Sequence, residues 1–466
     1  MSCLSAPVFG QYNAEFLGKK GLVVNEYPEY GVAVVRYHKS DNKWKVSTHG
    51  ACDRDDYDVR IHRSVIYDLT TKNVVHVSPI RRDTEEKIRI SELTRSEWDV
   101  SVYEDGTMIT VFWNKIINPE SGEPYGWTLS TRSKLHAVCK FTSDKLFRDL
   151  FQEAIDRTGF KYSSLKQEYS YTFILHHPDT RHVIPCNFGV SLSLVAVCDC
   201  NHTECVGEGP KVIPRFFSPE EVRVEVSRIN ATSLEGKEED CSLIMATIPV
   251  PGDNDEDLRK LIRSAIKGEN EYENVLSGIV IVNRSRPWVR IRILTPTYEK
   301  CLKLRGDRAN LRVNYVDLIL KDPTAALIRE YISFYPEEGG EVVKVSDSLR
   351  EVIHELYDLY IDRHVKKTKE HDNLPHWSRK PIWDIHGMYL RTRNVVRKPI
   401  VLKYLTSISP SAVHGILKNR EKELRRSMSR DSQTQVQDQA QIDNHNDDMS
   451  HTEEETEQEQ IEEASQ

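Results

Sequence analysis

The chain has 466 residues, enough for about two or three domains at roughly 150 residues each. Hydrophobic residues make up 38% of the chain, and the mean hydropathy is −0.55. The sequence contains no run of about 18 apolar residues, so no membrane span is predicted. The formal net charge of −8 comes from residues 431–466, which hold twelve Asp and Glu and no Lys or Arg. The remaining 64 basic and 60 acidic side chains form a mildly basic body, which permits nucleic-acid binding without arguing for it.

The N-terminal stretch lacks the basic and apolar regions of a secretory signal, so we expect an intracellular protein of the cytoplasm or nucleus, not a secreted one. In such a reducing compartment the nine cysteines are expected to be thiols or metal ligands and not a disulfide framework.

Residues 20–115 are predicted to form mostly strands, and "RSVIYDLTTKNVVHVSP" (63–79) contains two β-rich runs around a polar turn. Helical spacing of apolar residues then predicts a helix over 144–158, with Ser143 as its N-cap and Gly159 as its end. Strands are expected to resume at 170–184 and 189–198.

The segment "SPEEVRVEVSRI" (218–229) is ambiguous. It opens with an N-cap serine, a proline and a capping-box glutamate, which favour a helix, whereas "VRVEV" alternates as a strand does. A helix over 254–267 is followed by two more strands, 277–284 and 288–294.

From about residue 298 the apolar spacing becomes helical. These patterns predict an α+β domain with antiparallel sheets and flanking helices over 1–300, a helical domain over 301–430, and an acidic disordered tail over 431–466.

Six segments, in this order, have the layout of enzymes that attach a nucleotide covalently to a lysine. They are "RSVIYDLTTKNVVHVSP" (63–79), "YEDGTMI" (103–109), "WTLSTRS" (127–133), "YTFILHHPDTRHVI" (171–184), "SGIVIV" (277–282) and "WVRIRILTPTYEKCLKLRG" (288–306). Together they resemble the superfamily of RNA ligases, DNA ligases and mRNA capping enzymes. Within it the chain is most similar to the RNA-ligase-like proteins of large DNA viruses, and closest to the iridoviral immediate-early protein family.

The resemblance implies a nucleotidyltransferase-like fold and a nucleotide site. In that site Asp105 would contact the metal ion or the sugar, Arg132 would contact the ribose and Phe173 would stack on the base. Arg290 and Arg292 would contact phosphate. The implied ligand is a nucleotide, with magnesium, or RNA.

Three departures from the family pattern stand beside these matches. Tyr103 occupies the position of the nucleophilic lysine, Ser277 replaces a glutamate, and arginines replace the paired lysines of the last segment. Because the lysine amine is missing, we expect a viral early or regulatory protein on a degenerate RNA-ligase-like fold that does not catalyse covalent nucleotidyl transfer. Two alternatives remain: an active RNA ligase or guanylyltransferase whose nucleophile is displaced to Lys115, Lys134 or elsewhere, and an interaction scaffold that recruits protein partners through its tail.

A thiol-rich segment, "CDCNHTEC", places Cys198, Cys200, His202 and Cys205 within eight residues. These side chains suit zinc, but the spacing is not that of a standard finger, and we favour a thiol-rich loop over a metal site. Histidines 176, 177 and 182 are expected to flank a strand and its turn.

Overall fold

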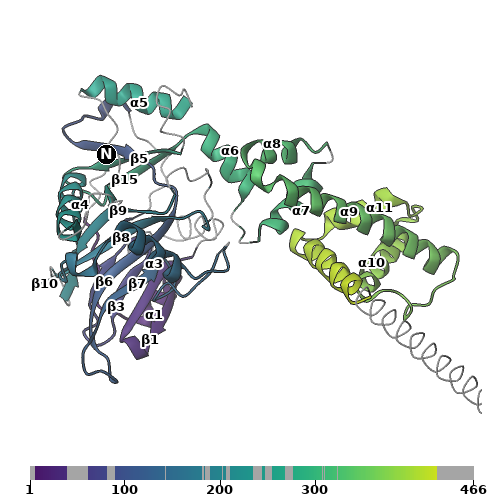
Figure 1. Cartoon of the computed structure of the whole chain (residues 1–466), viewed down its shortest axis with the longest axis horizontal. Helices are drawn as coiled ribbons and strands as arrows, with labels where there is room; N and C mark the ends of the chain where they lie inside the picture. Colours follow the sequence, from purple (N-terminus) through teal and green to yellow (C-terminus); the bar gives the residue numbers. More distant parts are fainter. Residues whose placement is uncertain are drawn as a thin grey trace, which may run out of the picture. The chain divides into compact units, whose positions relative to one another are not determined.

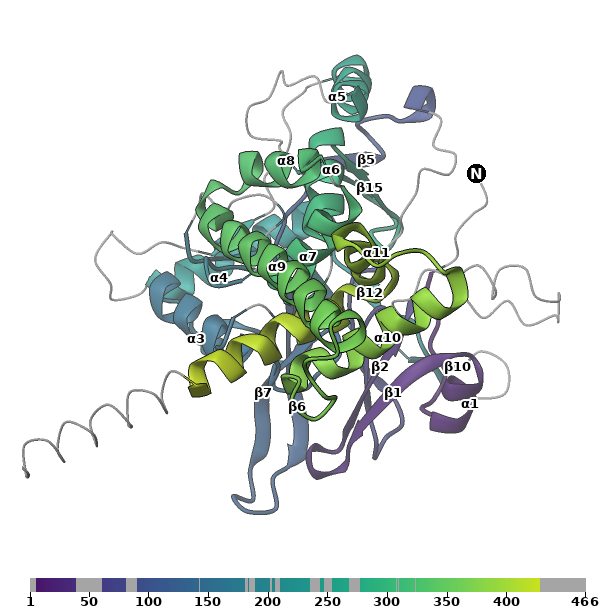
Figure 2. The same cartoon turned by 90° about the vertical axis from the view of Figure 1, so that its right-hand side faces the viewer.

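The computed structural model describes residues 6–38, 61–80, 90–141, 143–180, 183, 189–201, 203–205, 210–234, 244–246, 254–267, 277–306, 308, 310–322 and 324–427. The chain divides into two compact units, Met1–Ala309 and Asn310–Gln466, which are drawn in Figures 1 and 2. The predicted disordered tail, residues 431–466, lies outside the described residues.

The first unit is built on sheets whose described strands pair antiparallel, with the one exception that β13 runs parallel to β9. A four-stranded sheet follows chain order: β1 (Leu22–Tyr27), β2 (Val32–Tyr37), β3 (Val65–Asp68) and β4 (Val74–Val77). A three-stranded sheet has the order β15 (Arg290–Leu294), β14 (Gly278–Asn283) and β5 (Trp98–Val102). Two short strands, β10 (Thr203–Cys205) and β11 (Pro210–Val212), pair with each other.

The largest sheet has six strands, in the order β12-β9-β8-β6-β7 with β13 beside β9. Its strands are β6 (Thr107–Ile117), β7 (Pro124–Thr131), β8 (Tyr169–His176), β9 (Ser191–Asp199), β12 (Arg215–Phe216) and β13 (Met245–Ala246). The long neighbours β6, β8 and β9 form its centre and present alternate side chains to its two faces.

Helices cover one face of these sheets, because each buries an apolar stripe against the strands. One core lies where α3 and α4 pack on the six-stranded sheet, and another lies where α5 packs on the three-stranded sheet. The α-helices of this unit are α1 (Ala14–Lys19), α3 (Phe147–Thr158), α4 (Pro219–Leu234), α5 (Asp255–Lys267) and α6 (Pro296–Arg305). Single turns of 3-10 helix lie at Pro28–Tyr30, Ile90–Glu92 and Tyr162–Ser164.

Helix ends follow local chemistry. The ambiguous segment is a helix, α4: the Ser218 N–H donates to Glu221 Oε2 at 2.8 Å while the Glu221 N–H donates to Ser218 Oγ at 3.2 Å, and this reciprocal box stabilises a helical start. Helix α3 ends at Gly159, as predicted, with φ of 65°. Its predicted N-cap at Ser143 is wrong, because the helix begins at Phe147 and Ser143 Oγ accepts the Lys145 N–H in the preceding turn.

The second unit is helical. Its longest helix, α9, buries Val345, Leu349, Val352, Leu356 and Tyr360 along one face and continues into a π-helical turn. The helices are α7 (Leu311–Lys321), α8 (Ala326–Phe334), α9 (Gly339–Tyr360), α10 (His376–Thr392), α11 (Lys398–Ser407) and a last helix over 410–427, with a 3-10 turn at Pro336–Glu338 and the π-helical turn at Ile361–Val365. None of the described helices combines the length and apolar character needed to cross a membrane. The predicted class, antiparallel sheets with flanking helices followed by a helical region, is confirmed.

Candidate functional site

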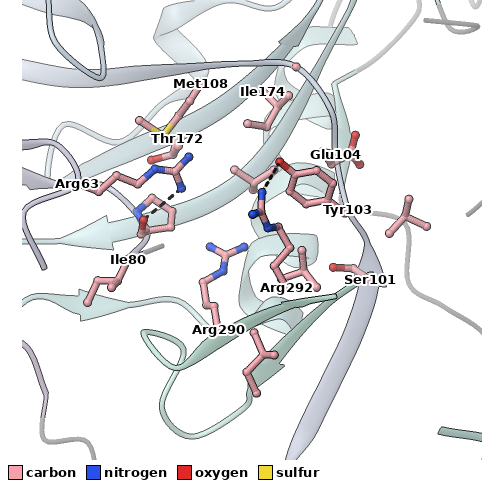
Figure 3. A pocket seen from close by; sticks show the side chains of 16 residues that line it. Arg63, Ile80, Ser101, Tyr103, Glu104, Met108, Thr172, Ile174, Arg290 and Arg292 are labelled. Atoms are coloured by element: carbon pink, nitrogen blue, oxygen red, sulfur yellow. Dashed lines mark hydrogen bonds between the residues drawn. The ribbon is translucent and has the colours of Figure 1, made fainter. Parts of the chain in front are cut away.

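A pocket lies between the three-stranded sheet and the face of the six-stranded sheet opposite α3 and α4 (Figure 3). It contains about 860 Å³ of empty space, part of it open to solvent. The described residues that line it are Arg63, Pro79, Ile80, Ser101, Val102, Tyr103, Glu104, Gly106, Met108, Thr172, Ile174, Val195, Val280, Arg290, Ile291 and Arg292.

Three arginines give the pocket its charge. Arg290 and Arg292 are two residues apart on β15, so the pleat of the strand points both into the pocket, and Arg63 reaches it from just before β3 (Figure 3). Burial, with Arg63 nearby, lowers the pKa of Arg290 to about 10. The Arg290 guanidinium forms no hydrogen bond or ion pair with any residue in the described ranges. A half-buried cation beside other cations and without a carboxylate is the arrangement of an anion site.

Tyr103 stands at the mouth of this pocket, where the family pattern has its lysine. The Arg292 Nη1 donates to Tyr103 Oη at 3.3 Å, and the guanidinium carbon lies 5.2 Å from the ring centre. The backbone of Tyr103 is fixed to β14, since its N–H donates to the Gly278 oxygen at 2.9 Å and its carbonyl accepts from Ser277 Oγ at 2.6 Å. Tyr103 is therefore held in place at both its backbone and its ring, and it offers a phenol where the sequence resemblance implies an amine.

A contact between a carboxylate and an imidazole lies beside the pocket. Glu104 lies 2.9 Å from His176 Nε2, and the two side chains are only 14% and 7% exposed. Glu104 is the one carboxylate among the described lining residues, and it faces His176.

Asp105 lies outside the described lining of the pocket. Its Oδ1 accepts from Tyr298 Oη at 2.9 Å and its Oδ2 accepts from the Val183 N–H at 2.7 Å. Burial, followed by the proximity of Tyr103 and Asp105, raises the pKa of Tyr298, so its hydroxyl stays a donor. Asp105 thus joins three segments of the chain beside the pocket.

Magnesium prefers several oxygen ligands, usually carboxylates and waters. Here both oxygens of Asp105 accept hydrogen bonds, Glu104 faces His176, and Ser277 stands where the family has a glutamate. These residues do not fit a resident divalent ion.

Arg132 is not among the described lining residues either, but it supports one of them. Its Nε donates to the Arg63 oxygen at 3.2 Å, its Nη2 donates to the Tyr37 oxygen at 3.0 Å, and its guanidinium lies 4.4 Å from the Tyr37 ring centre. It lies behind Arg63 and fixes the backbone from which Arg63 reaches the pocket.

Phe173 does not fit the role that the resemblance implied. It is fully buried and its ring centre lies 6.0 Å from that of Phe151 and 5.6 Å from that of Phe160, in the core under α3. Its neighbours Thr172 and Ile174 point to the other face of β8 and line the pocket. The alternation of the strand, not the residue type, decides which side chain meets a ligand.

Arg63, Glu104 and Thr172 line the pocket although none of them was named from the sequence. For Arg63 a signal existed, because it is the first residue of the 63–79 segment that carries the family resemblance. Lys115 and Lys134, proposed as displaced nucleophiles, are exposed and do not line this pocket, and no lysine is found among its described lining residues.

The thiol-rich segment is described in part. The sulfurs of Cys198 and Cys200 lie 3.6 Å apart, and burial is the main cause that raises the pKa of the Cys198 thiol, which disfavours the thiolate that zinc binds. His202 lies outside the described residues, and so does the side chain of Cys205. The four-residue zinc site stays a disfavoured prediction.

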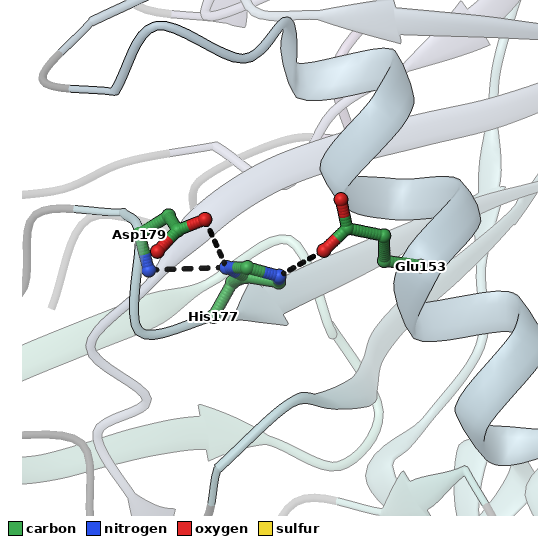
Figure 4. Close-up of side chains that lie close together, drawn as sticks. All are labelled: Glu153, His177 and Asp179. Carbon is green, nitrogen blue, oxygen red and sulfur yellow. Dashed lines mark hydrogen bonds and ion pairs between the residues drawn. The ribbon is translucent and has the colours of Figure 1, made fainter.

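A different cluster has the composition of a metal site. Glu153, His177 and Asp179 bring one ligand atom each within 4.8 Å of one another (Figure 4). His177 Nε2 lies 3.0 Å from Glu153, and its Nδ1 accepts the Asp179 N–H at 3.1 Å. The Lys145 Nζ lies 2.8 Å from Glu153 and 3.1 Å from Asp179, so a side-chain cation already offsets part of the negative charge of the cluster.

No protein-family model matches the chain, and no curated protein matches it. Among solved structures, it is similar to two forms of an archaeal ATP-dependent RNA ligase. Form 1 has 13% identity and a TM-score of 0.37, with 72% of each chain covered. Form 2 has 12% identity and a TM-score of 0.38, with 71% of this chain and 70% of that one covered.

An RNA ligase from Naegleria gruberi, solved with ATP and Mn, has 11% identity and a TM-score of 0.29. The match covers 47% of this chain and 57% of that one. At such low identity and TM-score, these likenesses say nothing about activity.

Proposed function

We propose that the pocket binds a nucleotide, or the end of an RNA strand, without forming a covalent bond to it. The single observation that carries this proposal is Arg290, a half-buried guanidinium without a partner among the described residues, which shares its pocket with Arg63 and Arg292. Phosphate oxygens supply the negative charge that the Arg290 guanidinium lacks among the described residues, and guanidinium groups bind them in a bidentate manner.

The chemistry of the remaining pocket residues supports binding and not transfer. Tyr103 holds the position of the family's lysine, and its hydroxyl is engaged by Arg292. A nucleotide entering the pocket would exchange that contact for phosphate. Any magnesium is expected to arrive with the nucleotide, because the residues around the pocket do not fit a resident ion.

From the sequence resemblance alone we extend this proposal. The chain is a nucleotidyltransferase-like pseudoenzyme of a large DNA virus, acting early in infection as a regulatory protein. The rival enzyme hypothesis needs a lysine that reaches the pocket.

Calorimetry with ATP and GTP, with and without magnesium, tests the binding. We expect Arg290→Ala to weaken binding by about 10- to 100-fold, the loss typical of hydrogen bonds to charged groups. Arg286→Ala, a half-buried arginine outside the described lining of the pocket, is the matched control and should bind as the unaltered chain does. Equal affinity of both variants would contradict the proposal.

Nucleotides labelled on the α-phosphate separate binding from transfer. We expect no label to remain on the denatured protein with magnesium or manganese. Label on a lysine would establish the enzyme hypothesis instead. If the chain neither binds a nucleotide nor keeps label, the interaction scaffold is the hypothesis that remains.

A further inference from the structure

The second unit has an unusual helix face on α10. Its buried residues, Trp377, Ser378, Pro381, Ile382 and Ile385, all point toward its neighbours in the unit. Directly opposite runs a stripe that we call the outer face of α10: His376, Lys380, Trp383, Gly387, Leu390 and Arg391. Trp383 is 71% exposed and Leu390 is 50% exposed. Tryptophan is rarely left so open to water without a partner that covers it.

The chain around this face is strongly basic. Residues 385–420 contain seven Lys and Arg and no Asp or Glu. Arg391, Arg393, Arg397 and Lys398 are exposed and make no ion pair with any residue that the structure describes. The Arg391 guanidinium lies over Gly387, 3.6 Å from the place a Cβ would take, so it covers the turn next to Trp383.

An open aromatic ring with exposed cations that begin about two helical turns away combines two kinds of contact. The ring offers a surface on which a base can stack, and the cations offer charge to the phosphates that follow it. Trp383 and Arg391 are eight residues apart, or about 12 Å along a helix. We propose that the outer face of α10, with Arg393, Arg397 and Lys398 beyond it, binds single-stranded nucleic acid.

The acidic end of this same chain is the competing occupant. Residues 431–466 carry twelve Asp and Glu and could satisfy the arginines. They contain no Phe, Tyr or Trp, however, and offer Trp383 only the small imidazole rings of His445 and His451 in place of a run of bases. The exposed tryptophan therefore favours a partner that brings both phosphates and bases.

Fluorescence anisotropy of the full chain with labelled single strands of about 20 nucleotides, one of uridine and one of deoxythymidine, tests this proposal. We expect affinity to fall as salt rises from roughly 50 to 200 mM. Binding of both strands supports recognition of phosphate and base alone, and a preference for one identifies its natural source as RNA or DNA.

Trp383→Ala is expected to weaken binding by about 5- to 150-fold, and Trp383→Phe to restore most of it. The triple variant Arg391→Gln, Arg393→Gln and Arg397→Gln should reduce the slope of log affinity against log salt by about 2. Arg350→Gln, an exposed arginine of α9 paired with Asp347, is the control and should leave both quantities unchanged. Circular dichroism checks that each variant keeps its helices.

Three outcomes would overturn the proposal. The first is that neither the full chain nor a chain that ends at residue 430 binds the strands, and the second is that Trp383→Ala binds them as tightly as the unaltered chain. The last is that Arg290→Ala loses binding while Trp383→Ala binds as the unaltered chain does. The last would move the strand to the pocket of the first unit. Binding that is stronger after removal of residues 431–466 and still weakened by Trp383→Ala supports the face, with the acidic segment as its competitor.

Discussion

Phe173 lies one residue from the pocket along β8 and yet on the other side of the sheet. Because it fills the core against Phe151 and Phe160, we expect Phe173→Ala to lower the free energy of unfolding by about 3–5 kcal/mol. Phe173→Leu keeps most of the volume and should bind nucleotide as the unaltered chain does. Urea unfolding and calorimetry on both variants check this. Loss of affinity in Phe173→Leu at unchanged stability would restore the base-stacking role.

Gly278 is a second residue at which backbone geometry decides the outcome. Its φ is +140°, and a Cβ there would lie 2.2 Å from the Ile293 oxygen of the neighbouring strand. We expect Gly278→Ala to separate β14 from β15 at the pocket and to lower the free energy of unfolding by more than about 3 kcal/mol.

Gly340→Ala gives the comparison for this prediction. Gly340 lies in helix α9 with open space around it, so alanine should be neutral or stabilising by about 0.5–1 kcal/mol. Thermal unfolding of the two variants measures the contrast, and similar melting temperatures would refute the steric reading.

The residue contacts explain what the sequence could predict of the site. Arg290 and Arg292 alternate within "WVRIRIL", so their common direction follows from the strand period. The same rule, applied to "YTFIL", forces Phe173 away from Thr172 and Ile174, but it cannot say which of the two faces meets the pocket. The position of Arg63 at the pocket depends on how the four-stranded sheet packs against its neighbours, a long-range arrangement that the local sequence pattern does not encode.

At the scale of elements, His76 connects two sheets. From β4, its Nδ1 lies 2.9 Å from Ser170 Oγ on β8 and its Nε2 lies 3.2 Å from Thr110 Oγ1 on β6. Burial lowers the pKa of His76 to about 3 from an ordinary value of 6.5. The folded protein therefore keeps this ring neutral across the physiological range.

The lowered pKa predicts acid sensitivity. Between pH 6.5 and about 3 the unfolded chain takes up a proton that folded His76 does not, so the free energy of unfolding falls as pH falls. The contribution is about 1.4 kcal/mol per pH unit. His76→Gln should be less stable at pH 7 but lose stability less steeply below pH 6.5. Urea unfolding across this range measures both slopes, and equal slopes would exclude His76 as the source.

Helix ends illustrate how far element boundaries can be predicted. The box of Ser218 and Glu221 is a local signal, and it correctly favoured a helix over the alternating strand pattern. At α3 the serine signal misled, because Ser143 caps a turn that stops before the helix begins. Local signals compete within a few residues, and packing of the apolar face against the sheet decides between them.

At the scale of the whole molecule, the two compact units have cores of their own. In the second, Glu338 accepts hydrogen bonds from Tyr315 and Tyr331, and Arg420 donates to Glu355, so its helices are joined internally. We expect residues 310–430 expressed alone to be helical and to unfold cooperatively, as a domain of this kind does. Circular dichroism with thermal unfolding is the measurement. A non-cooperative, weakly helical chain would show that the predicted helical domain needs the first unit.

Lys145 gives the cluster of Glu153, His177 and Asp179 a property that a bound metal ion could not provide. A side-chain ammonium group cannot diffuse away, be chelated or be exchanged for a competitor. The link between α3 and the turn after β8 should therefore hold in the presence of strong chelators and through wide changes in divalent-ion supply. Where a bound ion would couple such a joint to the supply of that ion, the half-exposed Lys145 contacts couple it to ionic strength instead, because salt screens them.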